Sequence, residues 1–333
     1  MRMLKRIVQS TPIPISGVML SFSALDTLFQ SLEHPVASYG PVKYICGSIA
    51  FLIFLVLTAK LFLCPAQVRG AMDKGNQAAI LPTYSMTLMN LSVFFKPFLG
   101  SISFGVWIVA IALHLALVIR FTWHFLVKLR WDEVFISYVV GYAGIANIAI
   151  TSPAYGMQPL GKLAFWLGFC CVSIVLIIAL RRQIRLPEMA EADQFLFLVI
   201  ASPMSVCLTG YVKAYGAGIS YPLLLGLFGI ATIFYVTALI QVPKFLKRSF
   251  YPSYASFTFP FVISAIVFYI TAYRISDAGS FGICGEPYCN FISVVYHFAV
   301  HSSHPAGDSF LVRSLHKKDG RGEPRKRREK ILP

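Results

Sequence analysis

Charged side chains are scarce in this sequence. Of its 333 residues, 13% are Asp, Glu, Lys or Arg, whereas 57% are hydrophobic. Soluble domains average about 25% charged and roughly 45–50% apolar residues, and the mean hydropathy here is +0.69. This little charge cannot cover the surface of a soluble chain, so the composition excludes ordinary soluble enzymes, disordered regulators and disulfide-rich scaffolds. We predict an all-α polytopic membrane protein.

Motifs for enzyme chemistry are absent as well. The sequence has no phosphate-binding loop, no Gly-x-Ser-x-Gly and no His-Glu-x-x-His. His297, His301 and His304 have no carboxylate or thiol in step with them, so they predict no metal site. Asp26 is the single carboxylate well inside an odd-numbered apolar span, and one such group does not make a proton relay. We therefore expect no catalytic residue, no metal, no cofactor and no enzyme activity.

What the chain does contain is a series of long apolar stretches. A membrane-spanning helix needs about 20 mostly apolar residues. Nine stretches meet this need and a tenth is weak: 13–31, 42–63, 80–99, 102–126, 134–152, 160–180, 194–212, 219–240, 254–273 and the weak 288–302. We therefore expect a cytoplasmic N-terminus over 1–12, a transmembrane domain over 13–302 with a doubtful tenth helix, and a basic, disordered tail over 303–333.

The orientation is predicted from the basic residues, which outnumber acidic ones by 29 to 14. Cytoplasmic loops carry the excess of Lys and Arg. If the N-terminus is cytoplasmic and the spans alternate, only five basic residues fall on the other side: Lys43, Lys96, Lys162, Lys213 and Arg274. This places a multi-pass protein in the plasma or inner membrane with its N-terminus inside. Because topology explains most of the net charge, no nucleic-acid partner is expected.

Polar residues and prolines concentrate in the odd-numbered spans. Hydroxyls and prolines recur there, whereas the even-numbered spans resemble plain lipid-facing helices. Unsatisfied polar groups are costly in lipid, so the odd spans are expected to form an inner ring of five helices around a pore. The alternative is that Ser and Thr bond only their own helix backbone. The candidates for lining the pore are Ser16, Gly17, Ser85, Thr87, Ser137, Pro203, Thr209, Phe257 and Pro260.

Three of the five basic residues on the non-cytoplasmic side lie at the ends of odd-numbered spans. Lys96, Lys213 and Arg274 are expected to surround a pore mouth and attract anions. The alternative is that they extend to lipid headgroups. In the ninth span Phe257 and Phe261 share a helix face and Phe259 takes the opposite face, so an aromatic gate is possible without either face being preferred.

Five short segments, in order, resemble the tellurite-resistance/dicarboxylate transporter family, which includes slow-type anion channels and malic-acid transporters. These segments are Pro14 to Leu20, Leu88 to Phe98, Val139 to Gly156, Ala201 to Tyr211 and Ser256 to Pro260. The resemblance covers residues 10 to 275.

The resemblance implies ten helices arranged as five helical hairpins around a central pore, with one pore in each subunit of a homotrimer. It also implies that a phenylalanine of the ninth helix plugs the pore, a role that falls on Phe259. The chain is thus expected to be an anion channel that passes small inorganic anions through an axial pore gated by Phe259. The alternatives are a secondary transporter of C4-dicarboxylates such as malate or a tellurite-resistance exporter, and, less in keeping with the sequence, a membrane scaffold or enzyme.

Overall fold

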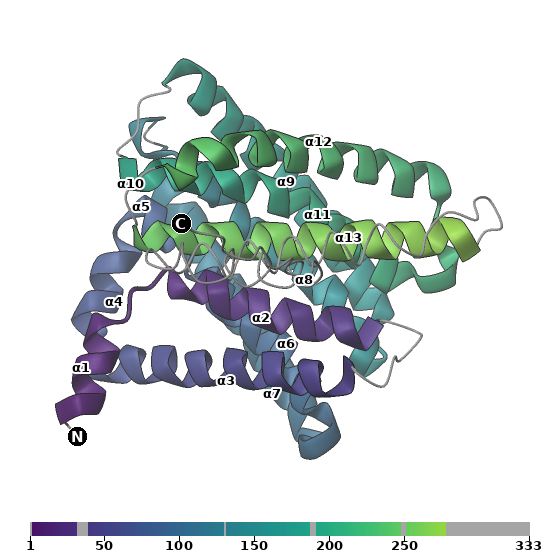
Figure 1. Cartoon of the computed structure of the whole chain (residues 1–333), viewed down its shortest axis with the longest axis horizontal. Coiled ribbons are helices and arrows are strands. Elements are labelled where there is room, and N and C mark those ends of the chain that lie inside the picture. The colour runs from purple at the N-terminus through teal and green to yellow at the C-terminus, as the bar shows by residue number, and fades with distance from the viewer. Residues whose placement is uncertain (1, 32–38, 130, 187–190, 248–250, 278–333) are drawn as a thin grey trace, which may run out of the picture. The chain divides into compact units, whose positions relative to one another are not determined.

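The computed structural model describes residues 2–31, 39–129, 131–186, 191–247 and 251–277, which form helices and no strand. The α-helices of Figure 1 are α1 (Arg2–Ser10), α2 (Ile15–Ser31), α3 (Tyr39–Leu63), α4 (Pro65–Met72), α5 (Gly75–Ala78), α6 (Pro82–Leu99), α7 (Ile102–Phe121), α8 (Val139–Thr151), α9 (Gln158–Arg185), α10 (Glu191–Gln194), α11 (Ser202–Tyr215), α12 (Tyr221–Leu246) and α13 (Thr258–Asp277). Shorter 3-10 or π segments are η1 (Thr122–Leu126), η2 (Trp131–Glu133), η3 (Ile136–Tyr138), η4 (Ser152–Tyr155), η5 (Phe195–Ala201), η6 (Gly216–Gly218) and η7 (Pro252–Phe257). The expected tenth span and the basic tail lie outside the described residues.

Seven helical stretches of the described chain are long and apolar enough to cross a membrane. They contain between 23 and 28 residues, and at 1.5 Å per residue even the shortest extends about 35 Å, more than the hydrocarbon thickness of a bilayer. Of the remaining expected spans, α2 has 17 residues and α8 has 13. This strand-free set of apolar helices is the architecture expected of an all-α polytopic membrane protein.

Prolines set where several α-helices begin. The expected spans 194–212 and 254–273 each start in 3-10 geometry, as η5 and η7, and turn into α11 and α13. Pro203 and Pro260 lie in the first turn of these α-helices. A first-turn N–H has no partner within its own helix, so a proline costs no intrahelical hydrogen bond there.

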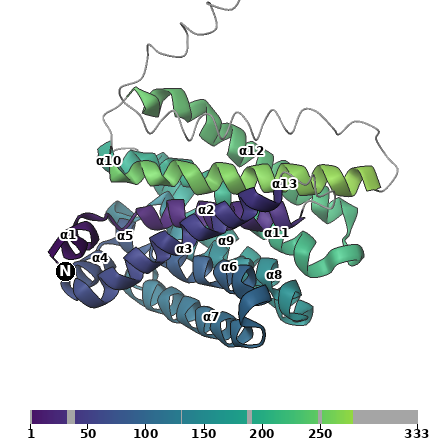
Figure 2. The same cartoon turned by 60° about the horizontal axis from the view of Figure 1, so that its bottom comes forward.

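Five helices contact one another in a closed order. Helix α2 contacts α6, α6 contacts α8, α8 contacts α11, α11 contacts α13, and α13 returns to α2. We call α2, α6, α8, α11 and α13 the inner ring. Figure 2 shows α2 beside α13 on one side and beside α3 and α6 on the other.

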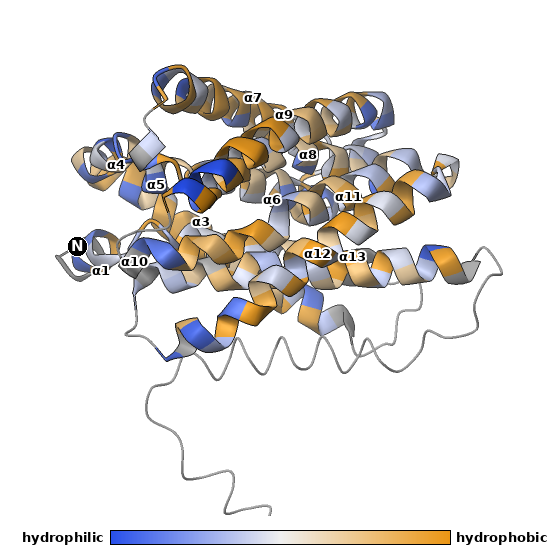
Figure 3. Cartoon of the chain, turned by 90° about the horizontal axis from the view of Figure 1, so that it is seen from above, coloured by the Kyte–Doolittle hydropathy of each residue, from blue (hydrophilic) through white to orange (hydrophobic). Residues whose placement is uncertain are grey.

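The other four long helices lie against the inner ring. Helix α3 contacts α2 and α6, α7 contacts α6 and α8, α9 contacts α8 and α11, and α12 contacts α11 and α13. In their most apolar parts, 28–39% of the residues of these four helices are buried, against 65–94% for the stretches that contain α6, α11 and α13. Figure 3 shows hydrophobic residues along most of α7, α9 and α12, with hydrophilic residues gathered toward helix ends. The helices that carry the internal hydroxyls and prolines are therefore the more buried ones.

Candidate functional site

Buried hydroxyl and amide side chains occur on every helix of the inner ring. Each of the following exposes at most 4% of its surface: Ser21, Ser23, Thr87, Asn90, Asn147, Thr151, Ser205, Thr209, Ser264 and Thr271. A polar group in the hydrocarbon region needs a partner within the protein. The partners of these side chains therefore define the polar part of the site.

Hydrogen bonds between these side chains join successive helices of the inner ring. Ser21 Oγ of α2 lies 2.8 Å from Thr258 Oγ1, the first residue of α13. Ser205 Oγ of α11 lies 3.3 Å from Ser264 Oγ of α13. These bonds hold α13 to its neighbour on each side.

Two asparagines extend this pattern through α6 and α8. The Asn90 amide donates to Ser23 Oγ of α2 at 3.0 Å, and the Asn147 amide donates to Asn90 Oδ1 at 3.2 Å. Asn147 also donates to the carbonyl oxygen of Met86 at 3.3 Å. Neither asparagine is among the predicted lining residues, although an asparagine in the middle of an apolar span is a sequence signal for a buried polar contact.

Asn90 faces the inner side of the ring, and Asn147 meets it from α8. Asn90 reaches α2 and α8 at once, and these two helices lie on opposite sides of α6 in the ring. Ser85, five residues earlier on α6, bonds His114 Nδ1 of α7 at 2.9 Å. Five residues turn a helix by about 140°, so Asn90 points away from the side of α6 that α7 covers.

The aromatic residues of the α13 region divide between two faces. Phe257 stacks on Tyr254, with ring centroids 5.1 Å apart, and contacts Phe195 and Phe245. Further along, Phe261 and Phe268 both meet Tyr235 of α12.

Phe259 is 8% exposed, and within the described chain no aromatic ring contacts it. Its side chain lies about 180–200° around the helix from Phe261 and Phe268. Since those two residues face α12 outside the ring, Phe259 points toward the ring's interior.

The other predicted lining residues lie in varied surroundings. Ser85 faces α7, while Thr87 and Thr209 donate to carbonyl oxygens of their own helices. Ser16 and Ser137 are buried, and their hydroxyls have no hydrogen-bond partner.

Gly17 permits a close approach of α2 to the chain before α13. A Cβ built there would lie 3.2 Å from the carbonyl oxygen of Ala255 in η7. Pro203 and Pro260 are buried at helix starts. The predicted lining set is thus not gathered at one constriction.

The predicted mouth cations all lie in last turns of inner helices. Lys96, Lys213 and Arg274 are in the last turns of α6, α11 and α13. Lys96 donates to the carbonyl oxygen of Ala154 and lies 5.3 Å from the centre of the Tyr155 ring. A cation there also complements the helix dipole, and α3, α7, α9 and α12 end in basic residues too.

The centre of the inner ring is closed in this conformation. Asn90 and Asn147 expose 4% and 3% of their surfaces, and Phe259 exposes 8%. Side chains this buried leave little room for water beside them. Permeation would require these side chains to move apart.

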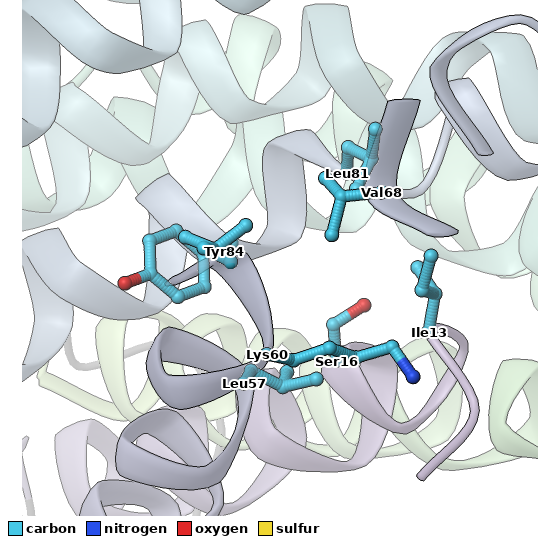
Figure 4. Close-up of a pocket in the computed structure, with 8 residues that line it drawn as sticks. Ile13, Ser16, Leu57, Lys60, Val68, Leu81 and Tyr84 are labelled. Atoms are coloured by element: carbon cyan, nitrogen blue, oxygen red, sulfur yellow. The ribbon is translucent and has the colours of Figure 1, made fainter. Parts of the chain in front are cut away.

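A separate cavity of about 40 Å³ lies between α2, α3, α4 and α6. Its lining is Ile13, Ser16, Leu57, Lys60, Leu61, Val68, Leu81 and Tyr84. Figure 4 shows the Ser16 hydroxyl pointing into this space. A space of this size holds a water molecule or two.

Lys60, which also lines the cavity, is 4% exposed. Its ammonium donates to three carbonyl oxygens where α1 ends: Val8 at 3.2 Å, Gln9 at 3.2 Å and Thr11 at 2.7 Å. Lys60 is not among the five basic residues expected outside, so topology makes it a cytoplasmic charge and no more. In the structure its three hydrogen bonds hold the end of α1 against α3.

No group of three His, Cys, Asp or Glu side chains within the described residues is placed to hold a metal ion. No protein-family model matches the chain, and no curated protein matches it. What the site does chemically therefore has to be inferred from its geometry.

Proposed function

We propose that the chain is an anion channel, similar to the tellurite-resistance/dicarboxylate transporter family in plan, with its pore along the axis of the inner ring. Phe259 is the gate, and small inorganic anions are the permeant species. The protein needs no cofactor and is not an enzyme.

The buried position of Phe259 on α13, on the helix face opposite Phe261 and Phe268, is the observation that supports this proposal. We infer that this large apolar side chain is directed into the inner ring, whose helices carry buried hydroxyl and amide groups. A bulky apolar group in a narrow polar passage blocks ions by its size and by excluding water. The other phenylalanines of this region pack against aromatic rings outside the passage, so we do not assign them this role: Phe257 contacts Tyr254, and Phe261 and Phe268 contact Tyr235.

The lining favours passive conduction over tight binding. Its polar groups are neutral hydroxyls and amides, which offer N–H and O–H donors to an anion without holding it by full charge. A channel needs an ion to enter favourably and still leave quickly. Lys96, Lys213 and Arg274, at the C-terminal ends of three inner helices, would raise the local anion concentration at the same end of the ring.

The membrane, orientation and assembly belong to the same proposal. The protein lies in the plasma or inner membrane with its N-terminus in the cytoplasm and assembles as a homotrimer with one pore in each subunit. The exposed apolar faces of α3, α7, α9 and α12 would then contact lipid or neighbouring subunits.

The test is anion flux into proteoliposomes under an imposed voltage, with chloride, nitrate and malate compared. Phe259→Ala is expected to raise the flux of chloride and nitrate at least about tenfold, because the plug is removed. Phe261→Ala is the matched control, since it truncates the same residue type two positions along but faces Tyr235 of α12. Equal flux in wild type and Phe259→Ala, at equal protein incorporation, would overturn the gate.

The same experiment separates the channel from a dicarboxylate transporter. A channel passes several anions, and its reversal potential follows their gradients. Flux of malate alone, and only with a pH gradient, would replace the channel by secondary transport. Removal of residues 314–333 is expected to leave the flux unchanged, and a loss of flux would favour a role for the tail.

A further inference from the structure

The Asn90–Asn147 pair is the one cluster of buried amide groups that joins three helices of the inner ring within the described chain. Both side chains are more than nine-tenths buried, and they connect α2, α6 and α8 through Ser23, Asn90 and Asn147. Hydroxyls elsewhere in the ring mostly donate to the carbonyl of their own helix, as Thr87, Thr209 and Ser205 do. The asparagines instead direct their N–H donors across helix boundaries.

The hydrogen bonds that the Asn147 amide donates lie at the long end of the usual range. The amide is 3.2 Å from Asn90 Oδ1 and 3.3 Å from the Met86 carbonyl oxygen, where N–H···O distances are usually about 2.7–3.2 Å. A ligand that accepts from this amide would replace these bonds with new ones, so the exchange costs little.

One of the two N–H groups of the Asn90 amide has no hydrogen-bond partner within the described chain. This amide carries two N–H groups, and among the described residues it donates one bond, to Ser23 Oγ. A buried N–H without a partner is costly. A species that accepts this bond would therefore be favoured at this position.

We propose that the Asn90–Asn147 pair is the anion-contact site of the pore and sets which anions pass. This inference rests on the proposed channel function. The ligand class is a small monovalent anion, such as chloride or nitrate, that has lost part of its water shell. When the ring opens, the Asn147 N–H turns from Asn90 Oδ1 to the anion, and the N–H of Asn90 that is not bonded to Ser23 donates to the same anion. The Asn147 N–H returns to Asn90 Oδ1 after the anion leaves.

The test uses the gate-free variant Phe259→Ala, so that the lining and not the plug limits conduction. Permeability ratios are measured from reversal potentials in planar bilayers with chloride, nitrate and sodium. Asn90→Leu and Asn147→Leu, each added to Phe259→Ala, are expected to lower chloride permeability relative to sodium about tenfold, the size of one lost hydrogen bond to a charged ligand. Nitrate, which holds its water less tightly, should lose less.

Asn147→Asp keeps the shape of the side chain and serves where a leucine prevents folding. Its carboxylate is expected to lower the ratio of chloride to sodium permeability about tenfold by repulsion of the anion.

Ser85→Ala is the matched control. Ser85 lies on α6 about 140° around the helix from Asn90, is as buried as Asn90, and bonds His114 Nδ1 of α7 at 2.9 Å, on the outer side of the ring. This variant should lose stability and keep its permeability ratios.

The outcomes distinguish this inference from the proposed function. If Phe259→Ala conducts anions and the asparagine variants keep its ratios, the contact site is overturned and the channel stands. If Phe259→Ala conducts no anions, the proposed channel function is overturned. The anion-contact site is then overturned too, because it depends on that function. Ratios that also shift in Ser85→Ala would assign the effect to general loosening of the ring and overturn the specific site.

Discussion

Gly210 of α11 lies directly against the main chain of Ala146 in α8. A Cβ built on Gly210 would sit 2.8 Å from the Ala146 carbonyl oxygen, closer than real side chains approach. At the same residue, a Cβ on Gly168 of α9 would sit 2.8 Å from the Ala146 nitrogen. Helix α8 thus packs against two glycines on neighbouring helices, α9 and α11, which also contact each other. Close approach of this kind is how membrane helices gain packing energy without a hydrophobic driving force.

Gly210→Ala is therefore expected to destabilise the protein. The added methyl group meets rigid backbone, so α11 and α8 must separate, at a cost of about 1–3 kcal/mol. The measurement is thermal or denaturant unfolding in detergent. Gly226→Ala is the control, because a Cβ at that position of α12 would meet nothing within 4 Å. A Gly210→Ala protein as stable as Gly226→Ala would contradict the close packing.

Gly144 and His114 form a second tight pair, between α8 and α7. A Cβ on Gly144 would lie 2.2 Å from His114 Cε1, and the imidazole is fixed by Ser85 Oγ and by the Gly141 carbonyl oxygen. We expect Gly144→Ala and His114→Ala each to lower stability and the double variant to cost less than their sum, with a coupling energy of about 1 kcal/mol or more. A double-mutant cycle of unfolding free energies measures it. Additive effects would show that the two sites do not press on one another.

The sequence predicted the all-α class and several long helices because it contains the run lengths that a membrane requires. The stretches 42–63, 102–126 and 219–240 correspond to long helices of the structure. The predicted bounds of the α-helices are less accurate where a proline or a 3-10 segment interrupts an apolar stretch. The span 134–152 has only 13 residues in α-helix, between η3 and η4.

Side-chain direction within a helix was the harder part. Hydropathy averaged along a span does not report which face turns inward, so Ser85 was grouped with pore-lining candidates although it bonds His114 of α7. The same averaging hid Asn90 and Asn147, whose importance depends on a contact between α6 and α8. Lys60 was assigned by topology, and only the fold brings the end of α1 to its ammonium.

Lys60→Met is expected to release α1 from α3. The variant keeps the length and apolar stem of the side chain but removes three bonds to carbonyl oxygens, each of the stronger, charge-assisted kind. Arg6 of α1 is exposed, so trypsin reports the release. Cleavage after Arg6, followed by mass spectrometry, should become about tenfold faster, the equivalent of one lost bond to a charged group. Lys74→Met, which removes an exposed cation, should leave the rate unchanged. Equal rates in both variants would show that Lys60 does not secure α1.

The bond between Ser21 and Thr258 offers a way to hold the gate shut. Their hydroxyl oxygens lie 2.8 Å apart, and Thr258 directly precedes Phe259. In a Ser21→Cys, Thr258→Cys variant, oxidation should join α2 to the start of α13. We expect this to abolish the remaining anion flux of the otherwise native protein, and dithiothreitol to restore it.

Adding Phe259→Ala to the two cysteines separates a locked gate from a damaged pore. If opening consists of moving Phe259 out of the passage, the cross-linked protein should conduct once that side chain is gone, with or without dithiothreitol. Flux measured in proteoliposomes before and after reduction gives the answer. A triple variant that conducts only when reduced would show that α2 and α13 themselves must separate, and the gate would then be the helix pair and not the phenylalanine.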